Sequence, residues 1–257
     1  MVSRGQRVVA ALALTALLCP TAWGEVTATD QTVTVTSGEL AMTLDRATGL
    51  PAVGGLTITD GPEAAPVVLG EAADWRIAED RAGFRQREVG AELTVATDIR
   101  ATEALLIDLA LTNGGDAQRL LTVAWSAPIA GADVTAWDGR GDRKTTSPEY
   151  RGGDIHLRLP LSVAFGEDTG VAVGLDPSRL LSQFTNSARP TDDGALVGFA
   201  TRLVLDPGQE INLPLCAFAF TPTFEHLDAV QRWYDLYPDA FSMHPGIRDS
   251  LIGGGGY

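Results

Sequence analysis

The segment Leu105-Leu106-Ile107-Asp108-Leu109-Ala110-Leu111-Thr112-Asn113-Gly114-Gly115 decides the fold class. Leucine or isoleucine recurs at every second position from residue 105 to residue 111, and an Asn-Gly-Gly turn signal follows directly. Side chains on a β-strand point alternately to the two faces of a sheet, so this period places one apolar face against a core. The segment therefore predicts a half-buried strand that ends in a tight turn.

The same alternation extends along most of the chain. Further strands are expected at 31–35, 40–44, 121–125, 170–175, 195–205 and 210–220. Strong turn formers separate them, among them Asp176-Pro177-Ser178 and Asp206-Pro207-Gly208. Many short strands with frequent turns favour a sandwich over alternating strand and helix units. The sequence thus predicts an all-β protein built on one large antiparallel β-sandwich.

The pattern changes after residue 222, where a short C-terminal helix is expected. Thr223 is a candidate cap for a helix that runs from about residue 224 to residue 236. Leu227, Val230, Tyr234 and Tyr237 follow at spacings of three, four and three, which indicates one packing stripe. Pro238 interrupts the helix, and one further turn is expected at 239–241.

Residues 1–24 are typical of a secretory signal peptide. Arg4 and Arg7 precede an apolar run at 8–18 that is too short to span a bilayer, and small residues at 22 and 24 suit cleavage before Glu25. We therefore expect a secreted or periplasmic protein, with the β-sandwich at 25–222. Residues 223–257 form the helix and a glycine-rich end, interpreted as a linker to a missing catalytic barrel.

The charge of the exported chain excludes several kinds of partner. Loss of Arg4 and Arg7 leaves 17 of 19 basic residues against 33 acidic ones, a net charge of −16. Such a surface repels phosphate backbones and anionic lipids, so we expect neither nucleic-acid nor membrane binding. No later stretch is apolar enough to cross a membrane. Neutral sugars meet no such repulsion.

A search for catalytic signatures finds none, and we expect no cofactor. His156, His226 and His244 lack metal-ligand spacing, and the 33 acidic residues offer too many pairs for a catalytic one to be chosen. Cys216 is the one cysteine after the signal segment, so no internal disulfide is possible, and it is interpreted as a buried small apolar residue.

One polar loop is a candidate carbohydrate site. Residues 136–154 are rich in charge and glycine and hold an aromatic residue near each end. Trp137 or Tyr150 would stack on a sugar ring, while Asp138, Asp142 and Lys144 would bind hydroxyl groups. The alternative is a solvated loop in which Trp137 packs back onto the core. Asp138 and Asp142 alone lack the further acidic positions of an EF-hand loop, so no metal site is predicted.

Three segments resemble a known family. Residues 38–50 resemble the opening hairpin of galactose-mutarotase-like supersandwich domains, and residues 205–210 resemble a hairpin near the end of that fold. Residues 229–241 resemble the helix that follows such a sandwich in some bacterial glycoside-hydrolase-like proteins. There the helix leads into a barrel that carries the catalytic carboxylates, so no catalytic residue is carried over to this chain.

Three functions remain in view from the sequence. The first is a non-catalytic accessory β-sandwich of a secreted glycoside-hydrolase-like protein, with a covalent or non-covalent catalytic barrel as its partner. The second is a stand-alone carbohydrate-binding module that uses the loop from Trp137 to Asp154. The third is a sugar epimerase of mutarotase-like fold, for which His156 with a nearby acid is the possible acid–base pair.

Overall fold

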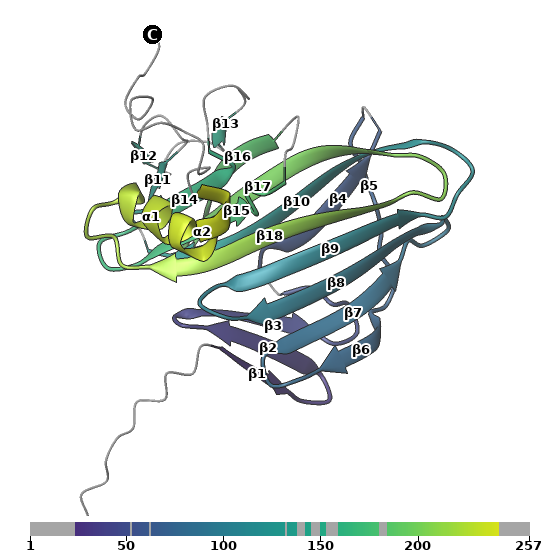
Figure 1. Cartoon of the computed structure of the whole chain (residues 1–257), viewed down its shortest axis with the longest axis horizontal. Coiled ribbons are helices and arrows are strands. Elements are labelled where there is room, and N and C mark those ends of the chain that lie inside the picture. The colour runs from purple at the N-terminus through teal and green to yellow at the C-terminus, as the bar shows by residue number, and fades with distance from the viewer. Residues whose placement is uncertain are drawn as a thin grey trace, which may run out of the picture.

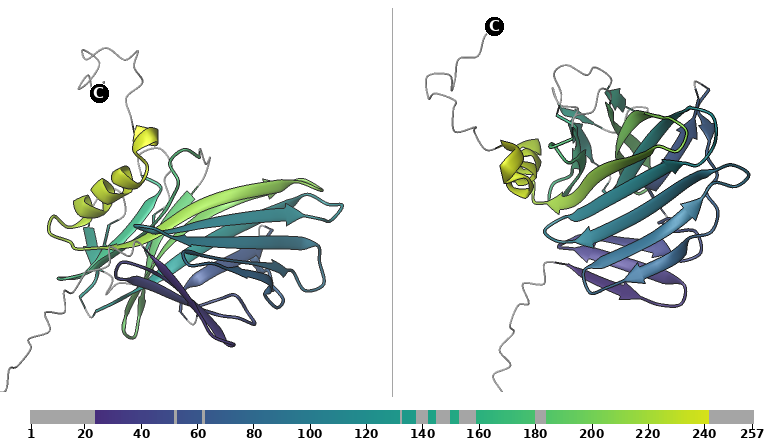
Figure 2. Two further views of the ribbon diagram at one scale, coloured as in Figure 1. Left: turned by 60° about the horizontal axis from the view of Figure 1, so that its bottom comes forward. Right: turned by 45° about the vertical axis from the view of Figure 1, so that its right-hand side comes forward.

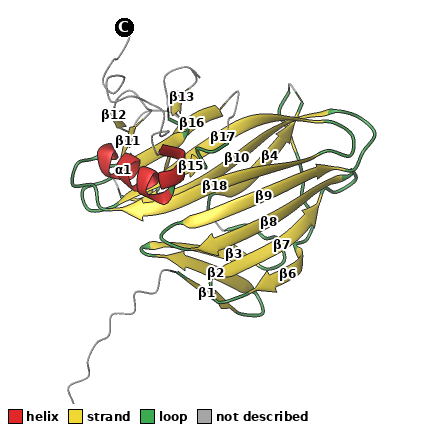
Figure 3. Cartoon of the chain, viewed as in Figure 1, coloured by secondary structure: helices red, strands yellow, loops and turns green. Residues whose placement is uncertain are grey.

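A computed structural model describes residues 24–51, 53–61, 63–131, 133–137, 142–144, 150–152, 159–179 and 184–241. Strands make up most of this part of the chain, and two short helices follow at its C-terminal side (Figures 1 and 3). Every pairing between the described strands is antiparallel. The predicted fold class, antiparallel β with a short C-terminal helix, is therefore confirmed.

The strands form three sheets. The nine-stranded sheet contains, in spatial order, β12 (Asp142–Lys144), β11 (Thr135–Trp137), β14 (Leu161–Phe165), β15 (Gly170–Leu175), β18 (Glu210–Phe220), β9 (Leu105–Asn113), β8 (Leu93–Ala101), β7 (Arg81–Arg87) and β6 (Ala73–Ile77). The six-stranded sheet contains β13 (Tyr150–Gly152), β16 (Phe184–Thr191), β17 (Gly194–Leu205), β10 (Arg119–Ala130), β4 (Gly55–Asp60) and β5 (Ala65–Pro66). The small sheet contains β1 (Glu25–Ala28), β2 (Thr32–Ser37) and β3 (Leu40–Asp45).

The main core lies between the nine-stranded sheet and the two smaller ones. β10 and β17 contact β15, and β2 contacts β7, β8 and β9, so the smaller sheets share one layer of the sandwich. In β9 the predicted apolar positions are completely buried, and the positions between them are partly exposed. The alternation that defines the opening segment is therefore the boundary between core and solvent.

β14 and β15 depart from this alternation, because every one of their residues is buried. Ser162 Oγ donates to the Gly198 carbonyl at 2.5 Å, so the two sheets approach closely on the inner side. On the outer side the helices cover the strands (Figure 2). A strand covered on both faces has no exposed position, which explains the continuous burial. Gly170 permits this packing, since a Cβ there would lie 2.2 Å from the Phe220 ring.

The two helices are α1 (His226–Leu236) and α2 (Pro238–Phe241). The break at Pro238 and the final turn are as expected, but the helix begins at His226, and Glu225 at its N-cap makes no side-chain cap. In the described part of the chain, neither helix has the length and apolarity needed to span a membrane.

The predicted packing stripe of α1 is wrong in part. Ala229 and Trp233 are the buried residues, whereas Leu227 is 59% exposed and Tyr234 is 36% exposed. Val230 and Tyr237 do pack against the protein. The face is thus rotated by about one residue from the predicted one, because it buries the largest side chain, Trp233.

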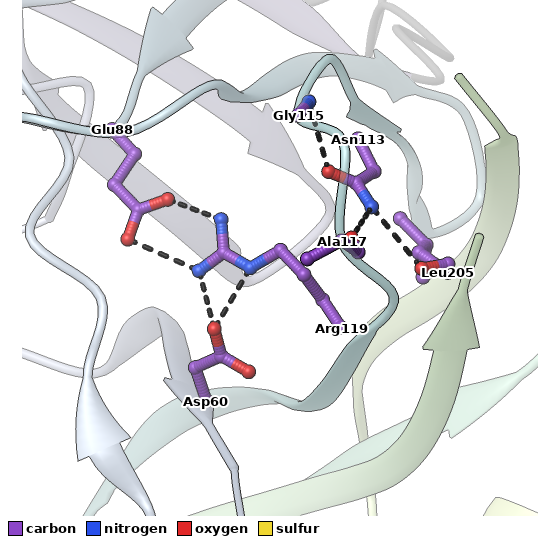
Figure 4. A network of polar contacts seen from close by, with 7 residues as sticks. All are labelled: Asp60, Glu88, Asn113, Gly115, Ala117, Arg119 and Leu205. Carbon is purple, nitrogen blue, oxygen red and sulfur yellow. Dashed lines mark hydrogen bonds and ion pairs between the residues drawn. The ribbon is translucent and has the colours of Figure 1, made fainter. Parts of the chain in front are cut away.

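A polar network ties the two large sheets together at the end away from the helices (Figure 4). Arg119, in β10, forms ion pairs with Glu88, which follows β7, and with Asp60 in β4. Its Nη2 lies 3.1 Å from Glu88 Oε1, and its Nε lies 2.8 Å from Asp60 Oδ2. The hydrogen bonds that the guanidinium donates to Glu88 raise the pKa of Arg119 most; burial lowers it by less, and the hydrogen bonds donated to Asp60 raise it further. The arginine is therefore fully charged within a largely buried site.

Candidate functional site

An open groove of about 930 Å³ lies where the two helices meet the turns of the nine-stranded sheet. In the chain that begins at Glu25, its walls come from the β6–β7 turn, the β8–β9 turn and the junction of α1 and α2, while Gly24, the last residue of the expected signal segment, lines it only before cleavage. The residues that line it are Gly24, Glu79, Asp80, Ala101, Thr102, Glu103, Leu106, Asp235, Leu236 and Pro238. Three parts of the chain that are distant in sequence therefore form one surface feature.

Hydrogen bonds fix the walls of the groove. Ala101 N donates to Asp80 O at 2.7 Å, which joins the two strand turns. Arg232 Nη2 donates to Glu103 O at 2.6 Å, which joins α1 to the β8–β9 turn. Trp233 Nε1 donates to Leu175 O at 3.0 Å and anchors the helix on the sheet. The groove is a preformed feature of the docked helix.

The groove has acidic side chains along its rim and apolar side chains between them. Glu79, Asp80, Glu103 and Asp235 are all exposed carboxylates, and Leu106 and Leu236 supply partly buried apolar surface. Carboxylates accept hydrogen bonds from hydroxyl groups, and apolar side chains suit the C–H faces of a sugar ring. Among the described residues, no group of three or more histidine, cysteine or acidic residues is placed to hold a metal.

The outer surface of the helices forms a second feature beside the groove. Phe224, Leu227, Tyr234 and Phe241 are 69%, 59%, 36% and 39% exposed, and we call these four residues the apolar ridge. Leu227 and Tyr234 are seven residues apart, two turns, so they share one side of α1. The rings of Tyr234 and Phe241 lie 4.3 Å apart. Among the described residues, every large aromatic side chain exposed to this degree belongs to the ridge.

The predicted carbohydrate loop is described in part. Trp137 ends β11, is 9% exposed and stacks on His226 with ring centroids 4.8 Å apart. Asp142 and Lys144 bound β12, and Asp142 pairs in register with Trp137. Tyr150 opens β13 in the other sheet, opposite Ala188. The structure therefore brings Trp137 and Asp142 together but assigns Tyr150 to a different sheet.

The remaining predicted positions lie outside what the structure describes. Asp138 and His156 fall outside the described residues, as do the side chains of Asp142, Lys144 and Tyr150. Carbohydrate binding by this loop stays a prediction. The groove and the ridge were not predicted as sites: the groove acids come from separate turns, and two residues of the ridge were assigned to a packing stripe.

Cys216 lies beneath α1 and is fully buried without a disulfide, as predicted for a small apolar residue. Burial raises the pKa of its thiol from 9.0 to about 12. A hydrogen bond joins the thiol to the Tyr237 hydroxyl, whose pKa burial also raises. The thiolate needed for nucleophilic chemistry is thus strongly disfavoured.

The buried thiol makes a testable prediction about reactivity. With the signal segment removed, native protein should be alkylated by iodoacetamide at pH 8 about a thousandfold more slowly than unfolded protein, because three pKa units lower the thiolate fraction by that factor. Mass spectrometry at timed intervals measures the rates, with guanidinium-unfolded protein as the control. Equal rates in the two states would contradict the burial of Cys216 under α1.

Comparisons with known proteins place the architecture. No family model matches the sequence, and no curated protein matches it. A putative aldose 1-epimerase from Klebsiella pneumoniae matches by structure with a TM-score of 0.53 and 12% identity, over 85% of this chain and 87% of that one. A galactose mutarotase related enzyme from Lactobacillus acidophilus has a TM-score of 0.46 and 8% identity, over 79% of this chain and 99% of that one.

A glycoside hydrolase domain is also similar. The galactosidase domain of an alpha-galactosidase–sucrose kinase matches with a TM-score of 0.49 and 10% identity, over 76% of this chain and 40% of that one. At these identities the likeness concerns the fold alone. The chain shares its fold with the putative aldose 1-epimerase, in agreement with the galactose-mutarotase-like resemblance of its sequence.

Proposed function

We propose that this chain is the non-catalytic accessory β-sandwich of an exported glycoside-hydrolase-like protein, and that the apolar ridge is its contact with the catalytic domain. The observation that carries the proposal is the exposure of Leu227, Tyr234 and Phe241 on helices whose other face is well packed, and of Phe224 in the turn just before α1. Clustered exposed aromatic side chains are typical of protein–protein contact surfaces.

The groove supports the carbohydrate part of this proposal. It opens beside the junction of α1 and α2, so a domain docked on the ridge would lie next to its carboxylate rim. Docking would exclude water from Leu236 and Pro238 and would leave the rim oxygens available to hydroxyl groups. Structural relatives that are carbohydrate-active enzymes agree with a hydroxyl-rich ligand.

Docking on the ridge is tested with the glycoside-hydrolase-like domain encoded directly after residue 257, either in the same open reading frame or in the next gene. The double variant Phe224→Ser, Leu227→Ser should bind this partner about 30-fold more weakly, since two anchors that each contribute about 1 kcal/mol are lost. Isothermal titration calorimetry measures the dissociation constant, and release of sugar from a panel of glycosides measures activity of the assembled protein.

A matched control separates docking from general surface polarity. Val68 and Val89 are 61% and 65% exposed and lie outside the helices, so Val68→Ser, Val89→Ser should leave binding within about twofold of the unchanged chain. Both double variants should keep the unfolding temperature of the parent. The proposal is wrong if no glycoside-hydrolase-like domain is encoded nearby, or if the two double variants bind the partner equally.

A further inference from the structure

One outward face of the sandwich is basic although the chain as a whole is strongly acidic. Arg81, Arg85 and Arg87 follow one another on the same side of β7, and all three are exposed while the positions facing the core are buried. Arg76 of β6 lies opposite Gly83, and Arg100 of β8 lies opposite Arg81. Cross-strand partners share a face, so all five arginines point to the same side.

We call Arg76, Arg81, Arg85, Arg87 and Arg100 the arginine face. It lies on the half of the nine-stranded sheet that the helices leave uncovered (Figures 1 and 2). Ladder neighbours toward β9 are small: Ala96 lies opposite Arg85, and Ala110 lies opposite Ala96. The guanidinium groups therefore lie beside a flat surface of small side chains rather than in a pocket.

Two of the five arginines have acidic partners on this face. Arg81 Nε lies 2.6 Å from Asp98 Oδ1, and Arg100 Nη2 lies 3.3 Å from Asp108 Oδ2. Among the described residues, no ion pair or hydrogen bond engages the side chains of Arg76, Arg85 or Arg87. Five arginines thus share the face with two carboxylates on β8 and β9. Asp74 of β6 and Asp80 of the β6–β7 turn are further exposed carboxylates at this edge, and Asp80 interacts electrostatically with Arg81.

We propose that the arginine face binds an acidic polysaccharide through its carboxylate or sulfate groups. Guanidinium groups bind both anions with paired hydrogen bonds, which favours arginine over lysine at such sites. Arg85 and Arg87 are two residues apart on a strand, about 7 Å, so they present successive donors to a linear chain of charges. This inference does not depend on docking at the apolar ridge.

The small width of a polysaccharide strand favours it over a nucleic-acid duplex or a lipid bilayer as the ligand of the arginine face. The exported chain carries a net charge of −16, which repels a duplex or a bilayer because either one extends well beyond the arginine face. A single glycan strand meets the arginines alone, and charges more than about 10 Å away are screened at ordinary salt. A local basic face is therefore compatible with an acidic protein when the ligand is narrow.

Arg76 lies on β6, the edge strand of the sheet, where an exposed charge also prevents pairing with other chains, and the experiment must separate this role from binding. The chain from Glu25 onward is run in native gels that contain polygalacturonate, heparin or dextran. Retardation by polygalacturonate or heparin is expected, while dextran should have no effect. Which of the two retards more strongly identifies carboxylate or sulfate as the preferred group.

The variant Arg85→Gln, Arg87→Gln should weaken polyanion binding about tenfold, as measured by gel retardation at several ligand concentrations. Arg189→Gln, Arg202→Gln is the matched control: both arginines are exposed on the six-stranded sheet, and the change in charge is the same. If the first variant self-associates in size-exclusion chromatography, the two single variants replace it, each with an expected loss of about threefold.

Several outcomes would overturn the inference. If neither polygalacturonate nor heparin retards the protein, the proposed binding is wrong. Equal weakening in the control variant would assign binding to net charge rather than to this face. Tighter binding of duplex DNA, or of phosphatidylserine vesicles, than of either polysaccharide would also contradict it.

Discussion

Replacing Trp233 with alanine is expected to lower the free energy of unfolding by about 3–5 kcal/mol, the usual cost of truncating a fully buried tryptophan. The side chain is 1% exposed and packs with the apolar residues of β14, β15 and β18 that face away from the main core. Its Nε1 donates to Leu175 O at 3.0 Å, and Phe241 packs on its ring at 5.0 Å. Urea denaturation followed by circular dichroism measures the change.

Two variants of the same helix test the origin of this loss. Tyr234→Ala should cost about 1 kcal/mol or less, because Tyr234 is 36% exposed although it is the next residue along α1. Trp233→Phe should retain most of the packing and lose the hydrogen bond to Leu175, and we expect an intermediate cost of about 1–3 kcal/mol. A Tyr234→Ala cost equal to that of Trp233→Ala would show that the helix, rather than the anchor, sets the effect.

Loss of the anchor should also be visible locally. An isolated helix of 11 residues is marginal in water, so α1 depends on tertiary packing. Hydrogen exchange should therefore show lost protection of the α1 amides in Trp233→Ala, with protection of β9 retained. Because α1 forms one wall of the groove, the groove should be lost in the same variant.

The main sandwich could be predicted from the sequence because its strands have a buried and an exposed face. Leu105, Ile107, Leu109 and Leu111 record the boundary between core and solvent directly, and the structure confirms their burial. The two-sided burial of β15 could not be predicted, since a short continuous apolar run does not identify what covers its second face. Only the docked helix explains it.

The face of α1 shows a further limit. Val230 and Tyr237 are each three or four residues away from both Trp233 and Tyr234. Spacing alone is therefore compatible with a packing stripe that contains Trp233 and with one that contains Tyr234. The contact between Trp233 and Leu175 decides the rotation, and it joins residues that are 58 positions apart in sequence. Long-range contacts of this kind leave no periodic signal.

The groove was equally beyond prediction. Its acids at positions 79, 80, 103 and 235 lie in two turns and a helix, and nothing in their spacing indicates that these elements meet. The alternating arginines of β7 are visible in the sequence, but their meaning depends on exposure and on Arg76 and Arg100 in neighbouring strands. The loop that did attract attention leads from one sheet, at Trp137, to the other, at Tyr150.

Arg119→Met should destabilise the protein by about 2–4 kcal/mol, because it leaves the largely buried Glu88 without its counter-charge and removes the partner of Asp60, whose side chain is 31% exposed. The arginine side chain is 14% exposed and that of Glu88 is 12% exposed, so water compensates little. The network joins β10 and β4 of one sheet to the segment after β7 of the other, as Figure 4 shows. Urea denaturation at neutral pH measures the loss.

An exposed pair of the same chemistry is the control for Arg119. Arg81 and Asp98 have side chains 54% and 30% exposed, so Arg81→Met should lower the free energy of unfolding by at most about 1 kcal/mol. This loss should be smaller in 0.5 M salt, because salt screens exposed ion pairs. The double variant Arg119→Met, Glu88→Gln should recover part of the stability lost in Arg119→Met, because one of the two stranded charges is removed with its partner. If Arg81→Met proves as costly as Arg119→Met, or if the double variant is less stable than the single one, burial of the network does not determine its contribution. In that case apolar packing holds the two sheets together at this end, and the ion pairs contribute little to the free energy of unfolding.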